Sequence, residues 1–168
     1  MTTATTSIKH AVDGYAPDEE RPLAAYAGLT TAFALSMAAA AAGIRLSGKE
    51  LPERPAVVDM VVAGIATHKI SRLLAKDKVT AFVRSPFTRY EESSGHGEVE
   101  EAPRGSGARY AIGELLVCPY CLAQWIAAGF AVGHVAAPRA TRFVGSIYVA
   151  QTLSDFLQLA YKAAEDRA

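Results

Sequence analysis

The feature that most constrains this chain is a long run without a charged side chain, from Leu23 to Ile44. Its 22 residues exceed the ~20 apolar residues that a helix needs to cross the hydrocarbon core of a bilayer. The preceding tail, residues 1–22, is polar and carries Asp18, Glu19 and Glu20 close to the run. A secretory signal would have a basic start and a shorter apolar core. We therefore predict an uncleaved membrane anchor behind a short solvated tail.

Further apolar segments extend this prediction to a helical bundle. Residues 115–138 contain no Asp, Glu, Lys or Arg, and Pro119 suits the first turn of a helix, which limits the spanning part to 119–137. Residues 143–161 are interrupted by Asp155 alone, whereas 56–75 is weaker because charged residues enter it. The expected fold class is an all-α integral membrane bundle, residues 23–168, of about four transmembrane helices (three if 56–75 lies in the interface), at 23–44, 56–75, 119–137 and 143–161.

Basic residues set the orientation of such a bundle. The whole chain has 17 basic and 17 acidic residues, which argues against a nucleic-acid partner, since nucleic-acid-binding proteins usually carry a basic surplus. In the four-span arrangement, 12 Lys and Arg residues lie in the tails and around the middle loop, residues 76–109, and 5 lie on the opposite side. Because cytoplasmic segments are enriched in Lys and Arg, both termini and the polar loop are expected in the cytoplasm.

The polar loop has a basic first part and an acidic second part. In the first part, aromatic residues alternate with basic residues that suit either anchoring by positive charge or binding to anionic lipid headgroups: Lys76, Lys78, Arg84 and Arg89. Residues 91–107 hold five Glu and five Gly or Pro, which predicts a solvated loop. Docking of a partner and folding back onto the basic neighbours are the alternatives. A short interfacial helix is expected over residues 108–117.

Cys118 and Cys121 form the sharpest local motif. Two thiols three residues apart share one helical turn, and a helix N-terminus favours thiolate. A redox pair and half of a zinc site are two interpretations, and a zinc site would need ligands such as His68 and His96 or a second chain. Packing of two small side chains at the start of a helix is the third interpretation. The prediction is therefore no cofactor, with zinc bound by Cys118 and Cys121 as the alternative.

Asp155 is the costliest residue for a membrane segment, because an ionised carboxylate at depth needs a partner. Gln151 and Gln158 lie on the same helical face, which is predicted to point into the protein. The expected intramembrane polar cluster adds residues from two other segments, namely His68, Lys69, Arg72 and Gln124. Structural pairing between helices and ion translocation are the two interpretations of this cluster.

Several short stretches have an unusual combination of residue types: Ala66–Arg72, Lys76–Thr80, Arg84–Thr88, Gly113–Cys121 with Trp125, and Ser154–Gln158. This combination resembles a family of small bacterial multi-spanning membrane proteins that is catalogued only as a domain of unknown function, some members being labelled sporulation proteins. The resemblance covers about residues 56–162. It implies a multi-pass protein of the bacterial cytoplasmic (inner) membrane, and it supplies no activity or substrate.

These observations favour a non-enzymatic membrane protein that acts as an anchor, an assembly factor or a small accessory subunit of a larger membrane complex. Its expected partners are other membrane protein subunits or a second copy of the chain, together with anionic lipid headgroups. A thiol-redox or metal-binding protein using Cys118 and Cys121 is the first alternative. An ion or small-solute carrier using Asp155 is the second.

Overall fold

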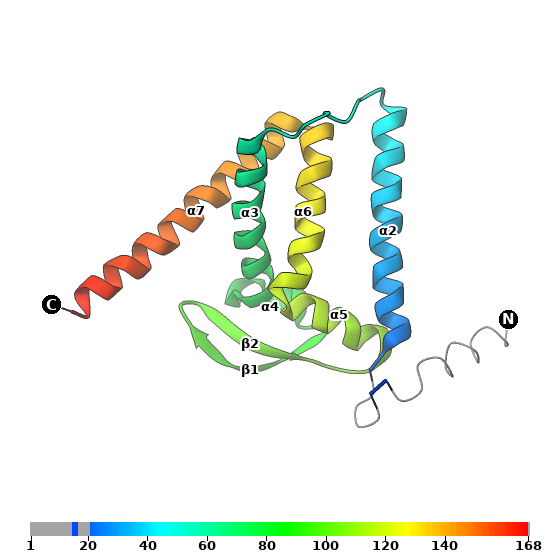
Figure 1. Ribbon diagram of the computed structural model, residues 1–168. Coiled ribbons are helices and arrows are strands. Elements are labelled where there is room, and N and C mark those ends of the chain that lie inside the picture. Colours follow the sequence, from blue (N-terminus) through cyan, green and yellow to red (C-terminus); the bar gives the residue numbers. More distant parts are fainter. Residues whose placement is uncertain (1–14, 17–20, 168) are drawn as a thin grey trace, which may run out of the picture.

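The structure, a computed structural model, describes residues 15–16 and 21–167. Most of the predicted polar tail, residues 1–22, therefore lies outside the described residues. The described chain is mainly helical with one β-hairpin (Figure 1). In chain order the elements are α2 (Leu23–Leu46), α3 (Val57–Lys76), the 3₁₀ helix η1 (Lys78–Thr80), α4 (Ala81–Arg84), β1 (Thr88–Gly95), β2 (Glu98–Pro103), α5 (Gly107–Val117), α6 (Pro119–Ala136) and α7 (Pro138–Glu165).

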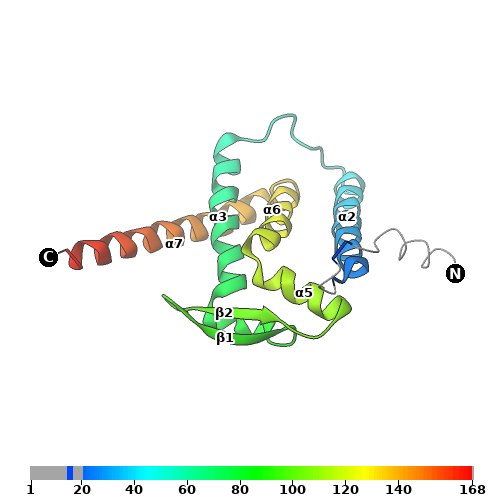
Figure 2. The ribbon, with the colours of Figure 1, turned by 60° about the horizontal axis from the view of Figure 1, so that its bottom comes forward.

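Helices α2, α6 and α3 stand side by side, and the hairpin lies across one end of them (Figure 1). Helix α3 packs between α6 and α7, while α2 makes fewer contacts, with α5 and α6. The hairpin, α4 and α5 gather at the end where α3 finishes and α6 begins, and we call these three elements the platform. Helix α7 starts at the opposite end and runs obliquely, so that its C-terminal half projects away from α6 (Figures 1 and 2).

Close contacts between the helices depend on small residues. A Cβ atom at Gly145 of α7 would lie 2.7 Å from Val62 Cγ1 of α3, and one at Gly133 of α6 would lie 2.6 Å from Thr141 Oγ1 of α7. The buried residues of α3 are correspondingly small: Ala66, Thr67, Ser71 and Ala75. Small side chains let helices approach closely, which explains the tight packing of α3 against its neighbours.

The predicted four-span bundle is wrong. Helices occupy all four predicted ranges, but α2 alone, among the described helices, is long and apolar enough by itself to cross a membrane. The pair α5–α6 meets the same test only when both helices are counted together, across a bend of 81°. Charged side chains interrupt the apolar runs of α3 and α7, and Gln124 and His134 lower the hydropathy of the 18-residue helix α6. These helices are therefore long enough for the predicted assignment but are not apolar enough when taken singly.

The all-α prediction is also wrong, because residues 88–103 form an antiparallel hairpin where a solvated loop was expected. The turn is built from Gly95, His96 and Gly97, which all have positive φ values of 80°, 46° and 84°. Glycine adopts this conformation without steric cost, so the Gly-rich sequence marks a tight turn. The strands were not predicted because their sequence is polar. Glutamates of β2 pair with basic side chains of α3 and α4 instead of facing an apolar core. The expected helix over residues 108–117 is present as α5.

Helix α2 is the least covered element. Ile44 is its only buried residue, although the helix is 24 residues long and apolar. It is held at its start by Glu114 of α5, whose carboxylate accepts hydrogen bonds from Tyr26 and, at 3.0 Å, from Arg21. Further along, the ring of Phe33 meets Trp125 of α6 edge-on, with centroids 5.1 Å apart. Most of the apolar surface of α2 is therefore uncovered by the rest of the described chain.

Candidate functional site

A groove of about 1060 Å³ lies between α3, the hairpin turn and the C-terminal half of α7. We call it the α7 groove. Its polar lining comes from three separate elements: His68, Lys69 and Arg72 of α3, His96 and Glu98 of the hairpin, and Asp155, Gln158 and Lys162 of α7. Apolar side chains of α7 complete the wall, including Phe156, Leu157 and Tyr161. The groove thus combines charged and apolar surfaces.

Ion pairs neutralise the principal charges of this groove. Lys69 Nζ lies 2.6 Å from Asp155 Oδ2 and so ties α3 to α7. Arg72 donates from Nε to Glu98 Oε1 at 3.0 Å and from Nη2 to Glu98 Oε2 at 2.5 Å. A two-point guanidinium–carboxylate pair fixes orientation as well as distance. The charged side chains are therefore engaged in holding three elements together around the groove.

The predicted polar cluster is brought together only in part. Five of its seven residues line the α7 groove, namely His68, Lys69, Arg72, Asp155 and Gln158. Gln151 and Gln124 are exposed and are not among the lining residues. Sequence reasoning missed the contribution of the hairpin, in particular Glu98 and His96. The usable signal was the acidic run of residues 98–101, which complements basic residues at helical spacing in α3.

The spacing of these charges explains why the hairpin lies where it does. Arg72 and Lys76 are one helical turn apart, about 6 Å along α3. Glu98 and Glu100 are two residues apart on one face of β2, about 7 Å along the strand. The two repeats match, so Arg72 pairs with Glu98 while Lys76 Nζ lies 2.6 Å from Glu100 Oε2. This ladder of two pairs docks β2 onto α3.

The other face of β2 holds a fully buried ion pair. Arg84 Nε lies 2.7 Å from Glu101 Oε2, and the two side chains are 0% and 6% exposed. Arg84 also donates to the backbone oxygens of Leu74 and Asp77 and to the hydroxyl of Thr80. The remaining donors and acceptors are therefore satisfied, as a buried pair requires. This pair fastens α4 to the end of α3 and to the hairpin.

The residues predicted to meet lipid headgroups divide into two groups. Arg84 is buried, and Lys76 is paired with Glu100, so both serve the interior of the platform. Arg89 is exposed on β1 but lies 2.8 Å from Glu91. Lys78 is exposed, and no carboxylate partner is present for it among the described residues.

Cys118 and Cys121 lie at the bend between α5 and α6, at the platform end of the molecule. Cys118 is the N-cap of α6, and its Sγ accepts a hydrogen bond from the Cys121 N–H at 3.2 Å. Pro119 occupies the first turn of α6, where the missing N–H costs nothing. No group of three or more His, Cys, Asp or Glu side chains able to hold a metal ion occurs in the described part of the chain. Within the described structure the Cys118 sulfur thus caps the N-terminus of α6.

A second polar cluster lies at the opposite end of the molecule. Asp59 at the start of α3 accepts hydrogen bonds from Arg142 of α7, the shortest being 2.7 Å from Nη2 to Oδ2. The Nδ1 atom of His134 is 3.9 Å from Asp59 Oδ2. Both ring nitrogens of His134 are buried without a hydrogen-bond partner. In the sequence, Asp59 was one of the charged residues that made residues 56–75 a weaker candidate for a membrane span. In the structure it joins α3 to α7.

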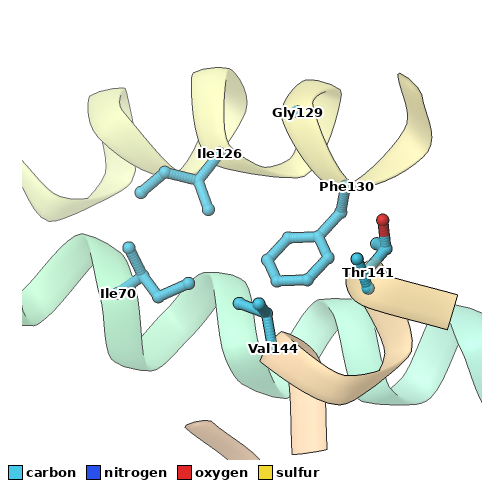
Figure 3. A pocket seen from close by; sticks show the side chains of 7 residues that line it. Ile70, Ile126, Gly129, Phe130, Thr141 and Val144 are labelled. Atoms are coloured by element: carbon cyan, nitrogen blue, oxygen red, sulfur yellow. The ribbon is translucent and has the colours of Figure 1, made fainter. Parts of the chain in front are cut away.

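A smaller hollow of about 400 Å³ lies between α3, α6 and the start of α7 (Figure 3). The ring of Phe130 projects into it, with Ile126, Ile70 and Val144 around the ring. Thr141 supplies the polar side chain of its lining, and the other lining residues are apolar or glycine. Such a lining offers packing surface without acid, base or nucleophile.

These features define a small helical protein that carries one apolar helix suited to crossing a membrane and a charge-locked hairpin platform. Residues 62–161, more than half of the chain, match the family described as "Protein of unknown function (DUF1360)". The chain therefore belongs to this family, which confirms the resemblance stated above.

Two curated relatives come from Bacillus subtilis (strain 168). The chain is 32% identical over 88 residues to Sporulation protein YjcA, which covers 51% of this chain and 75% of the relative. It is 26% identical over 90 residues to UPF0713 protein YngL, which covers 52% of this chain and 65% of the relative. No solved structure matches the chain.

Proposed function

We propose that this protein is a non-enzymatic, membrane-anchored accessory or assembly protein that uses the α7 groove to bind another membrane protein. The observation that carries the proposal is the exposure of α2, a 24-residue apolar helix in which Ile44 alone is buried. An apolar surface of this size in water would favour aggregation, whereas in a bilayer it faces acyl chains at no cost. Helix α2 therefore anchors the protein in the membrane.

The distribution of basic residues favours a cytoplasmic platform at the bacterial inner membrane. At the platform end lie Lys69, Arg72, Lys76, Lys78, Arg84, Arg89, Arg104 and Arg109. At the opposite end lie Arg45, Lys49, Arg54, Arg139 and Arg142. The start of α2 and the end of α7 are both on the platform side, so both termini belong to the cytoplasm in this orientation.

The α7 groove suits a protein partner better than a small substrate. Four of its charged side chains are paired with one another, Lys69 with Asp155 and Arg72 with Glu98, so these four are not poised for acid–base chemistry or ion transfer. Its apolar wall is exposed, with Phe156, Leu157 and Tyr161 about two-thirds accessible to solvent. An apolar wall beside a rim of neutralised charges is the usual anatomy of a protein–protein interface.

Native mass spectrometry of the full chain, released gently from its own membrane, tests this function. We expect the wild type in a larger assembly without metal, and loss of that assembly on substituting Leu157→Glu together with Tyr161→Glu. Tyr90→Glu, an equally exposed aromatic position on β1, is the matched control and should leave the assembly intact. A lone chain carrying metal, or lacking two hydrogens at Cys118 and Cys121, would refute the accessory role and favour the thiol-based one.

A further inference from the structure

The segment formed by η1 and α4, residues 78–84, has two distinct faces. Thr80 and Arg84 point inward, where Thr80 Oγ1 donates to the Leu73 backbone oxygen at 2.6 Å and Arg84 is fully buried. Val79, Phe82 and Val83 are outward, with exposed fractions of 75%, 75% and 45%. Their spacing of three and four residues places them on one side of the helical segment. A short helical segment therefore presents three apolar side chains that the described chain does not cover.

Three cations surround this apolar face. Arg104 Nη2 donates to the Ser85 backbone oxygen at 2.7 Å, and Arg109 Nε donates to the Pro86 backbone oxygen at 2.8 Å, so both guanidinium groups lie just beyond α4. Lys78 opens the segment itself. Within the described residues none of the three has a carboxylate partner, in contrast to Arg72, Lys76, Arg84 and Arg89. The carboxylate beside them is that of Asp77, whose Oδ1 accepts a hydrogen bond from the Val79 N–H at 2.9 Å at the start of η1. Three cations against this one carboxylate leave the face with a net positive charge.

Helix α5 fixes the position of this apolar face relative to the start of α2. Glu114 of α5 binds Arg21 and Tyr26 at the start of α2, and α4 contacts α5. Figure 1 shows α4 and α5 at the level where α2 begins, between the long helices and the hairpin. If α2 crosses the bilayer, as the proposed function holds, the surface of the bilayer lies at this level.

We infer that residues 78–84 dock onto the headgroup region of an anionic bilayer, with Val79, Phe82 and Val83 inserted and Lys78, Arg104 and Arg109 bound to lipid phosphates. Interfacial helical segments combine apolar side chains with flanking cations in this way. Each basic residue near an anionic surface contributes about fivefold to the ratio of docked to undocked segment. This assignment replaces Lys76, Arg84 and Arg89 of the sequence-based prediction by Arg104 and Arg109.

Site-directed spin labelling of the full chain in lipid nanodiscs tests the inference. Single cysteines replace Val83, Tyr90 or Leu35 in a background with Cys118→Ser and Cys121→Ala. The accessibility of each label is measured to oxygen, which enters lipid, and to a water-soluble nickel complex. The discs contain phosphatidylcholine alone or with added phosphatidylglycerol.

We expect the oxygen-to-nickel ratio at position 83 to exceed that at position 90, and to rise further with phosphatidylglycerol. Combining Lys78→Glu, Arg104→Glu and Arg109→Glu should lower the ratio at position 83 to the value at position 90. The matched charge reversal Arg89→Glu, at a cation already paired with Glu91, should leave it unchanged.

Three outcomes would overturn the inference. One is a label at position 83 as accessible to nickel as the label at position 90 in both lipids. Another is shielding from oxygen and nickel alike, which would show a protein cover. The third is a high oxygen-to-nickel ratio at position 83 that changes neither with phosphatidylglycerol nor with the charge reversals, which would overturn the assignment of the cations. The label at position 35, on the exposed side of α2, reports separately whether α2 lies in lipid. A failure of the proposed membrane anchor can therefore be distinguished from a failure of residues 78–84 to dock.

Discussion

The buried pair of Arg84 and Glu101 makes a direct prediction at the scale of single residues. Glu101→Gln leaves the Arg84 guanidinium buried without a counter-charge, so we expect the free energy of unfolding to fall by about 3–5 kcal/mol. Denaturant titration of the full chain in detergent micelles measures this change. The matched variant is Glu91→Gln, which breaks the exposed pair with Arg89 and should change stability by less than about 1 kcal/mol. Equal losses from both variants would contradict the burial of the first pair.

The pair of Lys69 and Asp155 distinguishes structural pairing from ion translocation. Asp155→Asn and Lys69→Met each leave one charged partner, so we expect both to destabilise the chain. The free energy of unfolding of the double variant should fall by less than the sum of the two single-variant losses. The difference, which is the coupling energy between the two positions, should be about 0.5–3 kcal/mol. A double-mutant cycle of unfolding free energies measures the coupling. A liposome flux that Asp155→Asn abolishes without loss of stability would contradict the structural assignment.

At the scale of elements, two glycines provide a matched comparison. A Cβ at Gly113 of α5 would lie 2.6 Å from the Phe87 backbone oxygen, which cannot move aside, whereas one at Gly129 of α6 meets nothing within 4 Å. We therefore expect Gly113→Ala to destabilise the chain by about 1–3 kcal/mol. Gly129→Ala should be neutral or stabilising by up to about 1 kcal/mol, because alanine favours the helix. Thermal unfolding followed by circular dichroism measures both, and a stabilising Gly113→Ala would contradict the packing of α5 against Phe87 and Pro103 at the base of the hairpin.

The elements also show which parts of the fold the sequence predicts. Long apolar runs predict helices, and residues 23–44 and 119–136 are helical because the hydropathy of a continuous run is a local property of the sequence. The hairpin, in contrast, depends on contacts with residues outside its own sequence. Residues 98–101 include three glutamates, which on their own read as solvated, and they form a strand because Arg72, Lys76 and Arg84 lie opposite them. Tertiary pairing of this kind overrides the strand propensity of single residues.

At the scale of the whole molecule, the α7 groove joins residues that are far apart in the chain. Asp155 could be selected from the sequence because a charge in an apolar run needs a partner, and Lys69 was among its candidates. Glu98 and His96 could not, since their place depends on a hairpin that the sequence did not reveal. The helical side of the groove was therefore predicted, whereas its hairpin side was missed, although the acidic run of residues 98–101 was a signal for it.

The orientation of the molecule is testable in intact cells. In a cysteine-free background, Glu50→Cys marks the loop after α2 and Tyr90→Cys marks the hairpin at the opposite end, both at exposed positions. Because basic residues concentrate at the platform end, we expect a membrane-impermeant maleimide to label position 50 in intact spheroplasts, and position 90 only after lysis. The reverse pattern would place the platform outside and remove the cytoplasmic setting of the α7 groove. Labelling of both positions only after lysis would mean that α2 does not cross the membrane.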